Sequence, residues 1–317
     1  MNDMRAALYD SYGPPEVLYV GKVPVPELQQ GQVLVRVHAA SVNGGELYGR
    51  AGRVRLVTGR TFPQRTGIDF AGEVAEVDPA VTGLRPGARV WGVLPRTFGS
   101  AAEYVAVRPR NLSYAPENIG LVEAASLPVG TTAITALQAK ARLKAGERLL
   151  VRGASGGVGS IAVQLGKALG AHVTALAGTN NLDFVRELGA DEAHSYATTG
   201  PSDLGRFDVI MDTVGTELRA FRRLLAPGGR MVSIALDIDH AAASLGYVLA
   251  STAHGRGRVR VFSGNPKHAL FAELARYVES GAIRPVVDTV HPLSGIAAAH
   301  RALEAGGVRG KHVIQVV

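Results

Sequence analysis

A glycine-rich segment between an apolar run and a helical pattern constrains the fold most. The stretch VRGASGGVGSIAVQLGKALGAHV, residues 151–173, contains three closely spaced glycines at positions 156, 157 and 159. The residues before these glycines are typical of a strand, and those after them have the spacing of a helix. A turn without side chains lets the helix pack on the strand and lets its free N–H groups face an anion. The stretch therefore predicts a strand–turn–helix unit that binds a phosphate group.

Strand-like and helix-like patterns alternate on both sides of this turn. Helical spacing runs through residues 158–170 and 181–189, and each pattern separates two short apolar runs. The apolar runs are ERLLVRG, AHVTALAG, FDVIMDTVG, GRMVSIAL and VRVFSG. Strands that alternate with helices at this length form βαβ units. Residues 125–265 are therefore predicted to form a doubly wound parallel sheet with helices on both faces.

The residues on either side of this segment have a different pattern. Residues 1–124 contain short β-rich runs, such as GQVLVRVHAASVN and GEVAEVD, and predict a β-barrel-like domain. The tail, residues 266–317, starts with a long helical pattern and ends with strand-like pieces around a helix. We expect the tail to complete the first domain. The predicted fold class is α/β, with residues 125–265 inserted into a β domain of residues 1–124 and 266–317.

The glycine positions indicate what the turn binds. Gly156 lets the backbone approach a pyrophosphate, and Gly159 lets the helix pack closely on the strand. Ala154 replaces the first glycine of the usual G-x-G-x-x-G pattern, directly after Gly153. Because the turn follows a strand and opens a helix among βαβ units, it predicts a dinucleotide site and not an ordinary tight turn. The predicted contacts from the turn are Ala154, Ser155, Gly156, Gly157, Val158 and Gly159.

The end of the second strand of the predicted sheet indicates which dinucleotide binds. A site for NADH normally places an acidic residue there, on the ribose 2′-hydroxyl. Here the strand ends in ALAGTNN, and the first acid, Asp183, lies in the next helical pattern. A missing carboxylate removes repulsion toward a 2′-phosphate, so NADPH is the predicted cofactor, although no Lys or Arg stands at this strand end. The predicted contacts are Gly178, Thr179, Asn180, Asn181 and Tyr196.

The composition excludes several classes of protein. The chain has no cysteine, which excludes disulfides and thiolate zinc sites, and its histidines are scattered without metal-ligand spacing. The net charge of +7 favours anionic partners in general, including phosphate-bearing cofactors. We find no secretion signal and no apolar run of about 18 residues or more. A cytoplasmic location away from membranes is therefore expected.

Several motifs together support one family resemblance. They are GASGGVGSIAVQLGKALGA, ELGADEAHSY, AASVNGGELYGRAG, PQRTGIDFAGEV, GSAAEY, AASLPVGTTAITAL and GKHVIQV, and they span nearly the full length. The chain resembles the medium-chain dehydrogenase/reductase superfamily, in its zinc-independent quinone oxidoreductase branch of ζ-crystallin-like proteins. The resemblance implies a GroES-like β-barrel domain with an inserted Rossmann domain. It also implies NADPH in the cleft between the domains, and a homodimer.

The resemblance also bears on a catalytic metal. Zinc-dependent relatives carry a cysteine in the stretch that corresponds to ASVNGGEL. They also carry a His-Glu pair where this chain has Gly67-Ile68-Asp69. Catalytic zinc needs about three protein ligands, and neither place supplies a cysteine or a histidine here. We therefore expect no catalytic metal.

Individual catalytic roles also come from the resemblance. Asn43 and Thr131 would lie near the nicotinamide, and Tyr48 near the substrate, although a turn-stabilising Asn43 and an ordinary packed Tyr48 are the alternatives. GGE follows Asn43 where the family usually has Pro-x-Asp, which could reshape the substrate pocket. Further cofactor contacts are expected at later strand ends, where Asp212 has the alternative role of a turn or cap residue. These contacts are Asp212, Val214, Ser233, Phe262 and Ser263.

These residues predict an enzyme in which the nicotinamide carries the chemistry, since no metal and no evident acid–base pair are present. Quinones suit such a site because conjugation stabilises the oxyanion that forms when they accept a hydride. An α,β-unsaturated ketone or enoyl group works by the same logic, with a proton from Tyr48 or water. The glycine-turn block also resembles enoyl reductase domains of polyketide synthases. An enoyl reductase is therefore the alternative enzyme.

Clustered arginines indicate a function of another class. They can bind RNA phosphates, and some ζ-crystallin relatives are RNA-binding or structural proteins. A solvated loop explains the same pattern, and no aromatic-rich platform for single strands accompanies the arginines. We therefore expect a small-molecule quinone or enone as the partner, and not a nucleic acid. The arginines concerned are Arg50, Arg53, Arg55, Arg60, Arg65, Arg256, Arg258 and Arg260.

Overall fold

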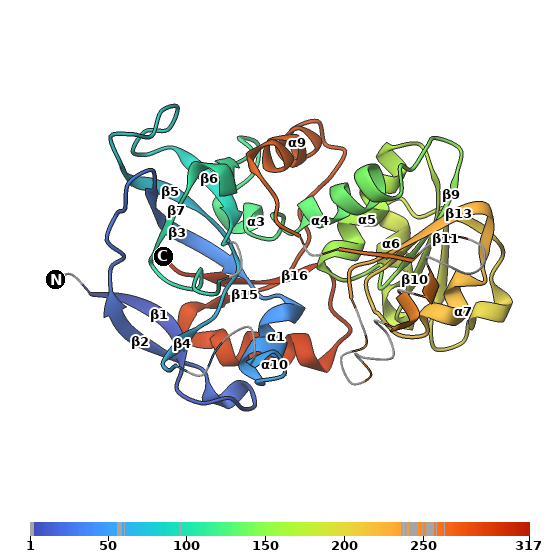
Figure 1. The fold of residues 1–317 in the computed structure, drawn as a ribbon, viewed down its shortest axis with the longest axis horizontal. Helices are drawn as coiled ribbons and strands as arrows, with labels where there is room; N and C mark the ends of the chain where they lie inside the picture. Colours follow the sequence, from blue (N-terminus) through green and yellow to red (C-terminus); the bar gives the residue numbers. More distant parts are fainter. Residues whose placement is uncertain are drawn as a thin grey trace. The chain divides into compact units, whose positions relative to one another are not determined.

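The computed structural model divides the chain into two compact units. It describes residues 3–317 apart from 56–58, 60, 95, 96, 236, 238, 239, 241–245, 249, 252–256, 258 and 263. The first unit comprises Met1–Val129 with Asn265–Val317, and the second comprises Gly130–Gly264. The chain thus leaves the first unit once and returns to it (Figure 1). The predicted domain boundaries, at 124/125 and 265/266, stay a prediction.

The second unit is built on a six-stranded parallel sheet with the strand order β11-β10-β9-β12-β13-β14. The central part of β9 is apolar and buried, as expected of a parallel strand that is covered on both faces. This confirms the predicted doubly wound parallel sheet. The strands are β9 (Arg148–Arg152), β10 (His172–Ala177), β11 (Glu192–Ser195), β12 (Phe207–Asp212), β13 (Leu225–Ser233) and β14 (Val259–Val261).

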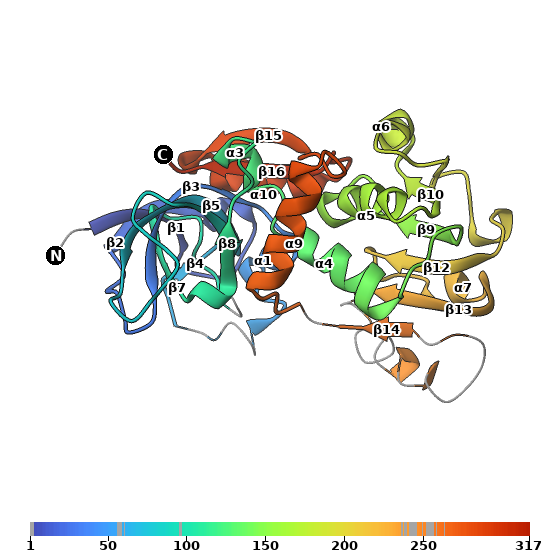
Figure 2. The ribbon, with the colours of Figure 1, turned by 90° about the horizontal axis from the view of Figure 1, so that it is seen from above.

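Helices cover both faces of this sheet because the strand order reverses at β9. β10 lies on one side of β9 and β12 on the other, so right-handed crossovers place the connecting helices on opposite faces. Figure 2 shows α5 (Gly157–Ala168) and α7 (Leu218–Arg222) on opposite faces. Other helical segments whose bounds the structure describes are α4 (Gly130–Ile134), the π-helix η3 (Thr135–Lys140), η4 (Thr179–Asn181), α6 (Leu182–Glu187) and η5 (Pro201–Asp203).

The helical pattern of residues 122–143 is divided in the structure. α3 (Leu121–Ala124) ends before Pro128 in the first unit, and α4 begins after it in the second. Proline lacks an N–H and disfavours the helical conformation in the residue before it, so a break at Pro128 is the expected one. The π-helix that continues α4 was not predicted from the spacing.

The first unit contains two β-sheets. The larger has the order β15-β16-β3-β5-β6-β8 with β7 paired to β3, and the smaller has the order β2-β1-β4. β16 pairs antiparallel with β3, with Ile314 opposite Ala40, so the tail completes the sheet of the N-terminal residues. The strands are β1 (Asp3–Tyr9), β2 (Tyr19–Pro24), β3 (Val33–Ser41), β4 (Gln64–Arg65), β5 (Asp69–Val77), β6 (Arg89–Val93), β7 (Tyr104–Val107), β8 (Leu112–Tyr114), β15 (Val287–Pro292) and β16 (Lys311–Gln315).

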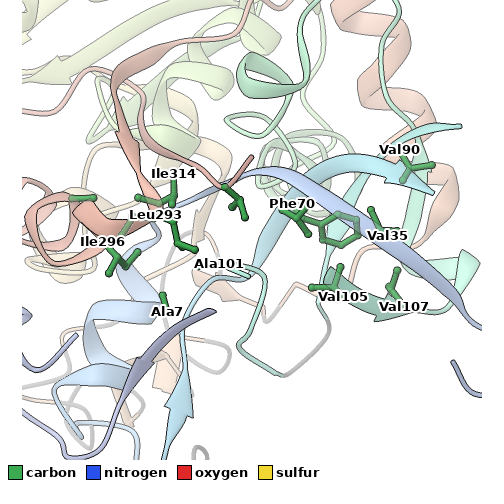
Figure 3. Close-up of a cluster of buried hydrophobic side chains, with 14 of the residues drawn as sticks. Ala7, Val35, Phe70, Val90, Ala101, Val105, Val107, Leu293, Ile296 and Ile314 are labelled. Carbon is green, nitrogen blue, oxygen red and sulfur yellow. The ribbon is translucent and has the colours of Figure 1, made fainter. Parts of the chain in front are cut away.

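One hydrophobic core joins the tail to the N-terminal strands. Figure 3 shows Leu293, Ile296 and Ile314 of the tail in the same buried cluster as Val35 and Phe70. Each large apolar side chain that becomes fully buried stabilises the fold by about 1.5–3 kcal/mol. Apolar burial therefore holds the tail on the first unit, in addition to the strand pairing.

The helices of the first unit are α1 (Gly44–Arg50), α3, α9 (His268–Glu279) and α10 (Ile296–Ala305), with the 3-10 segments η1 (Pro15–Val17), η2 (Pro109–Asn111) and η6 (Leu293–Gly295). α9 confirms the long helical pattern that follows residue 266, since Phe271, Leu274, Ala275 and Val278 form one buried face. α10 contacts α1 (Figure 1). The helix α1 was not predicted, because the two glycines that open it weaken a helical pattern.

Candidate active site

The turn between β9 and α5 leaves no room for a side chain at two of its glycines. A Cβ atom at Gly159 would lie 2.1 Å from the carbonyl oxygen of Gly153 and 2.9 Å from Cα of Ala154. At Gly153, where φ is +68°, a Cβ atom would lie 2.3 Å from Thr213 Oγ1. Glycine is therefore required at both positions by the close approach of the protein to itself.

Gly156, the residue before α5, is not crowded in this way. A Cβ atom there would meet only the carbonyl oxygen of Gly153, at an ordinary contact distance of 3.5 Å. Its backbone is extended, and its carbonyl oxygen accepts the N–H of Ser160 at 2.8 Å. The N–H groups of residues 157–159 precede that first hydrogen bond and point out of the helix N-terminus. The turn is thus an open cradle of N–H groups at the positive end of a helix dipole.

Four strands bring their carboxyl ends to one edge of the parallel sheet. Arg152 of β9 pairs with Leu176 of β10 on one side and with Asp212 of β12 on the other, and Asp212 pairs with Ser233 of β13. In sheets of this order, ligands bind outside this edge, next to the point where the order reverses. The glycine turn lies at that point.

Asp212 is buried and its two oxygens are engaged by the protein. Oδ1 accepts hydrogen bonds from Arg152 Nη1 at 2.7 Å and from the N–H of Val214 at 3.2 Å. Oδ2 accepts hydrogen bonds from the N–H of Gly215 at 3.0 Å and from Ser233 Oγ at 2.7 Å. The carboxylate therefore holds the turn after β12, which is its alternative role. Its contact with a cofactor stays a prediction.

Arg152 is a residue that the sequence reasoning missed. Its guanidinium stacks on Phe221, 3.6 Å from the ring centroid, and donates to Asp212 and to the carbonyl oxygen of Thr216 at 2.7 Å. Burial lowers its pKa, and the charge of Asp212 acts in the opposite direction. In the sequence, a basic residue at the end of an apolar strand could have indicated this pair. A buried guanidinium group needs a buried anion as its partner.

The end of β10 offers neutral hydrogen-bonding groups. Thr179 Oγ1 and Ser195 Oγ lie 2.7 Å apart, and Tyr196 is 65% exposed. A Cβ atom at Gly178 would lie 3.3 Å from the Tyr196 hydroxyl oxygen, so these predicted contacts do lie together. Asp183, the first acid after the strand, pairs with Arg186 at 2.8 Å along α6.

The remaining residues predicted to contact the cofactor differ in exposure. Thr131 is buried in α4, and its carbonyl oxygen accepts a hydrogen bond from Thr135 Oγ1 at 2.8 Å. Val214 is exposed after β12, and the ring of Phe262 lies 6.0 Å from Lys140 Nζ. The predicted cofactor contacts that are partly exposed in the glycine turn are Ser155, Gly156, Gly157 and Val158. The predicted contact at Ser263 lies outside the described residues.

The first unit holds a polar cluster around Asn43, which precedes α1. We call Asn43, Glu46, Asp69 and Lys311 the Asn43 cluster. Asn43 Nδ2 donates to Glu46 Oε1 at 2.8 Å and to Asp69 Oδ2 at 3.2 Å. Asn43 Oδ1 accepts a hydrogen bond from Lys311 Nζ at 2.5 Å. One amide therefore connects two carboxyl groups and one ammonium group.

Three elements far apart in the sequence build this cluster. Glu46 lies in the first turn of α1, Asp69 begins β5 and Lys311 begins β16. Their exposed fractions are 2%, 0% and 5%. Because Lys311 belongs to the tail, the cluster forms only when the tail joins the first unit.

Burial changes the proton affinity of two members of the cluster. Burial, and after it the charge of Asp69, raise the pKa of Glu46 to about 7, against hydrogen bonds and the charge of Lys311. Burial also lowers the pKa of Lys311, against the attraction of both carboxyl groups. The sequence reasoning assigned no role to Asp69 or Lys311. The signal was a charged residue inside each of the apolar strand patterns GIDFAGEV and GKHVIQV.

Tyr48 lies on α1 next to this cluster in sequence but outside its hydrogen bonds. The side chain is 38% exposed, and the Arg53 guanidinium lies 5.9 Å from its ring centroid. Asn43 is partly exposed. The structure thus places Asn43 directly before α1 and Tyr48 within α1, with an accessible ring on Tyr48. Their catalytic roles stay predictions.

The structure divides the arginine cluster that suggested RNA binding. Arg50 is buried, and its guanidinium binds the carboxylate of Glu304 and the carbonyl oxygen of Gly13. Arg50 is therefore not part of a surface that could bind phosphates. Arg53 and Arg55 are exposed. The arginines outside the described residues are Arg60, Arg256 and Arg258.

The part of the chain that the structure describes contains no group of three His, Cys, Asp or Glu side chains placed to hold a metal ion. The chain has no cysteine at any position. None of the described helices is long and apolar enough to cross a bilayer.

Two family models match the chain. The model described as "Alcohol dehydrogenase GroES-like domain" matches residues 29–117, within the first unit. The model described as "Zinc-binding dehydrogenase" matches residues 188–314, from the parallel sheet into the tail.

Curated relatives and solved structures match over the whole length. The chain is 33% identical to a 2-methylene-furan-3-one reductase of Solanum lycopersicum, over 100% of this chain and 80% of the relative. It is 33% identical to an NADPH-dependent alkenal/one oxidoreductase, chloroplastic, of Arabidopsis thaliana, over 98% of this chain and 79% of the relative. The solved structure of the quinone oxidoreductase from Coxiella burnetii matches with a TM-score of 0.90 and 30% identity, and the match covers 100% of both chains.

Proposed function

Because the chain belongs to the medium-chain dehydrogenase/reductase superfamily, in its zinc-independent quinone oxidoreductase-like branch, we propose that it is an NADPH-dependent oxidoreductase. Its acceptor is a quinone or a related electron-poor carbonyl compound or alkene. The observation that carries the proposal is the open backbone at Gly156, where α5 begins at the carboxyl edge of the sheet. A helix N-terminus at this place suits a pyrophosphate.

The residues of the second unit fit a bound dinucleotide. The N–H groups of residues 157–159 would hold the pyrophosphate, and glycine at 156 would leave room for it beside the backbone. Thr131 and Phe262 would lie near the nicotinamide. When bound, the cofactor supplies the hydride. The chain's own contribution is to hold and orient the reacting groups and to exclude water.

The proposed preference for NADPH over NADH rests on the end of β10. Thr179 and Tyr196 present neutral groups there, and the carboxylate of Asp183 is paired with Arg186. A 2′-phosphate therefore meets hydrogen-bonding groups and no unpaired acid from these residues. The printed name of the Arabidopsis relative, an NADPH-dependent enzyme, supports the same choice.

Reduction of an activated alkene is the second candidate. The relatives named 2-methylene-furan-3-one reductase and alkenal/one oxidoreductase support it. Addition of a hydride to the β carbon of an enone leaves an enolate, which needs a proton. The exposed Tyr48 hydroxyl on α1, or water, would deliver this proton. A quinone gives a resonance-stabilised oxyanion and needs less help from the protein.

Three further parts of the proposal concern the whole protein. We propose a homodimer and a cytoplasmic location, as the family resemblance and the sequence imply, with the cofactor held by the residues of the second unit. RNA binding is the alternative of another class, and the burial of Arg50 weakens it.

A screen of NADPH oxidation tests the proposal. Purified protein would be mixed with quinones, enones and enoyl thioesters in separate assays, with NADH run in parallel. We expect turnover of NADPH with at least one quinone or enone, and slower turnover of NADH. The proposal is contradicted if the protein binds neither nucleotide. Salt-dependent RNA binding without any oxidation of NADPH would support the binding-protein alternative instead.

A further inference from the structure

The Asn43 cluster contains two carboxyl groups but only one ammonium group, in a site that is shielded from water. If Glu46, Asp69 and Lys311 were all ionised, the cluster would carry one excess negative charge. An uncompensated buried charge is costly, whereas one bound proton makes the cluster neutral. The cluster therefore favours a form in which one carboxyl group holds a proton.

Three further titratable groups face this region and do not change that balance. Burial lowers the pKa of His312, next to Lys311 on β16, and so favours its neutral ring. Burial raises the pKa of Tyr9, on β1, to about 12, so its hydroxyl is neutral near pH 7. Arg50, on α1, is paired with the carboxylate of Glu304. The place of the proton is therefore decided between the two carboxyl groups of the cluster.

Both carboxyl groups accept hydrogen bonds, so the position of Lys311 beside Asp69 assigns this proton to Glu46. Asp69 accepts hydrogen bonds from the N–H of Ser41 at 3.0 Å and from Ser41 Oγ at 2.9 Å, in addition to that from Asn43. Lys311 Nζ lies 3.7 Å from Asp69 Oδ2. Donors and a nearby positive charge favour the ionised form of a carboxyl group. Burial and the charge of Asp69 instead raise the pKa of Glu46 to about 7.

The orientation of Asn43 determines which oxygen of Glu46 can hold the proton. Lys311 donates to Asn43 Oδ1, so Nδ2 is the atom that faces Glu46 Oε1, and Oε1 must accept. Oε2 lies 3.0 Å from the N–H of Gly67, which can only donate, and 3.0 Å from Thr66 Oγ1, which can also accept. A proton on Oε2 is therefore donated to Thr66.

We propose that Glu46 is a positioning residue that acts through Asn43, and that its protonated form supports turnover. With the proton, the cluster is neutral and Lys311 and Asp69 hold the Asn43 amide. Without it, Asn43 Nδ2 donates to two charged carboxylates, and Lys311 alone balances them. The excess negative charge would also oppose the negative charge that the acceptor gains with a hydride. The effect on turnover rests on the proposed function, whereas the protonation of Glu46 does not.

Infrared difference spectra of the full-length protein test the protonation. We expect the wild type to show a protonated-carboxyl band that disappears with a midpoint near pH 7. Glu46→Gln should lack this band. The variant keeps an acceptor for Asn43 and a donor for Thr66, but it cannot titrate. Glu103→Gln, which removes a partly exposed carboxylate paired with Arg5, is the control and should retain the band. A wild type without the band overturns the proposal.

The pH profile of kcat/KM tests the effect on turnover. Between about pH 6 and pH 8.5, the wild type and Glu103→Gln should lose activity roughly fivefold, whereas Glu46→Gln should stay level. Glu46→Asp keeps a titratable group, so the infrared band and the pH dependence of kcat/KM should both remain, with shifted midpoints. This variant also provides the test if Glu46→Gln does not fold. A fall that persists in Glu46→Gln overturns the positioning role. If the wild type oxidises no NADPH, the proposed function fails, and the infrared band alone decides the protonation.

Discussion

Single residues in the glycine turn are required for two different reasons. Gly159 has no room for a side chain, because Gly153 and Ala154 lie against it. Gly156 has room within the protein, and its extended backbone is one that any residue can adopt. The sequence pattern treats the two glycines alike. The structure indicates that Gly159 is needed for folding, whereas Gly156 is needed only if a ligand approaches the backbone.

Alanine substitutions at these two positions should therefore have different effects. Gly159→Ala places a methyl group against backbone atoms and should destabilise the protein by about 1–3 kcal/mol or more. Gly156→Ala should change the free energy of unfolding by less than about 1 kcal/mol but weaken NADPH binding at least about tenfold, since the methyl group fills the cradle. Urea unfolding and calorimetric titration with NADPH measure the two quantities. Normal NADPH affinity in Gly156→Ala would contradict the proposed pyrophosphate site.

At the scale of elements, the π-helix η3 depends on arginines from distant strands. Arg230 of β13 donates to the carbonyl oxygens of Ala141 and Arg142, just after η3, and binds both oxygens of Glu147 at 2.6 and 2.8 Å. Arg260 of β14 donates to the carbonyl oxygen of Lys140. The last carbonyl groups of a helix have no partners within it, so these guanidinium groups supply what the helix cannot.

Replacement of Arg230 should loosen this helix end. Arg230→Met keeps the apolar stem but leaves two carbonyl oxygens and the Glu147 carboxylate without their partner, which should cost about 2–3 kcal/mol. Arg301→Met is the matched control, because it breaks an exposed ion pair with Glu16 that water screens, and it should destabilise the protein much less. Guanidinium unfolding of both variants gives the comparison. Equal costs would show that the arginine does not stabilise the end of η3.

At the scale of the whole molecule, each compact unit carries a different part of the proposed chemistry. The second unit presents the glycine turn and the neutral end of β10 for a nucleotide. The first unit presents the Asn43 cluster and Tyr48, and it is complete only with β16 from the tail. A nucleotide that binds the folded protein and not the unfolded chain increases the free energy of unfolding by mass action.

Thermal unfolding should reveal both the binding and the preferred cofactor. NADPH at a free concentration of about 100 times its Kd should stabilise the folded state by about 2.7 kcal/mol and raise Tm. NADH at the same concentration should raise Tm less, because it cannot use the groups proposed for the 2′-phosphate. Differential scanning calorimetry at several concentrations separates the two. A larger shift with NADH would reverse the proposed cofactor preference.

Much of the fold could be predicted because it depends on local sequence patterns. Alternating apolar runs and helical spacing indicated the parallel sheet, and Pro128 indicated the break before α4. The short helix α1 escaped prediction because its first turn contains two glycines. The π-helix also escaped, since its spacing differs little from that of an α-helix. The catalytic roles proposed for Asn43 and Tyr48 came only from a family resemblance.

The sequence by itself determined the doubly wound sheet and the glycine turn at its edge, since both depend on periodicity and on residues close together in the chain. Only the tertiary structure decided that Asp212 is engaged by Arg152 and Ser233. It also decided that Asn43 and Lys311, 268 positions apart, share a hydrogen bond. The physical reason is that burial and charge compensation are properties of groups brought together by folding, and their spacing in the chain carries no information about them.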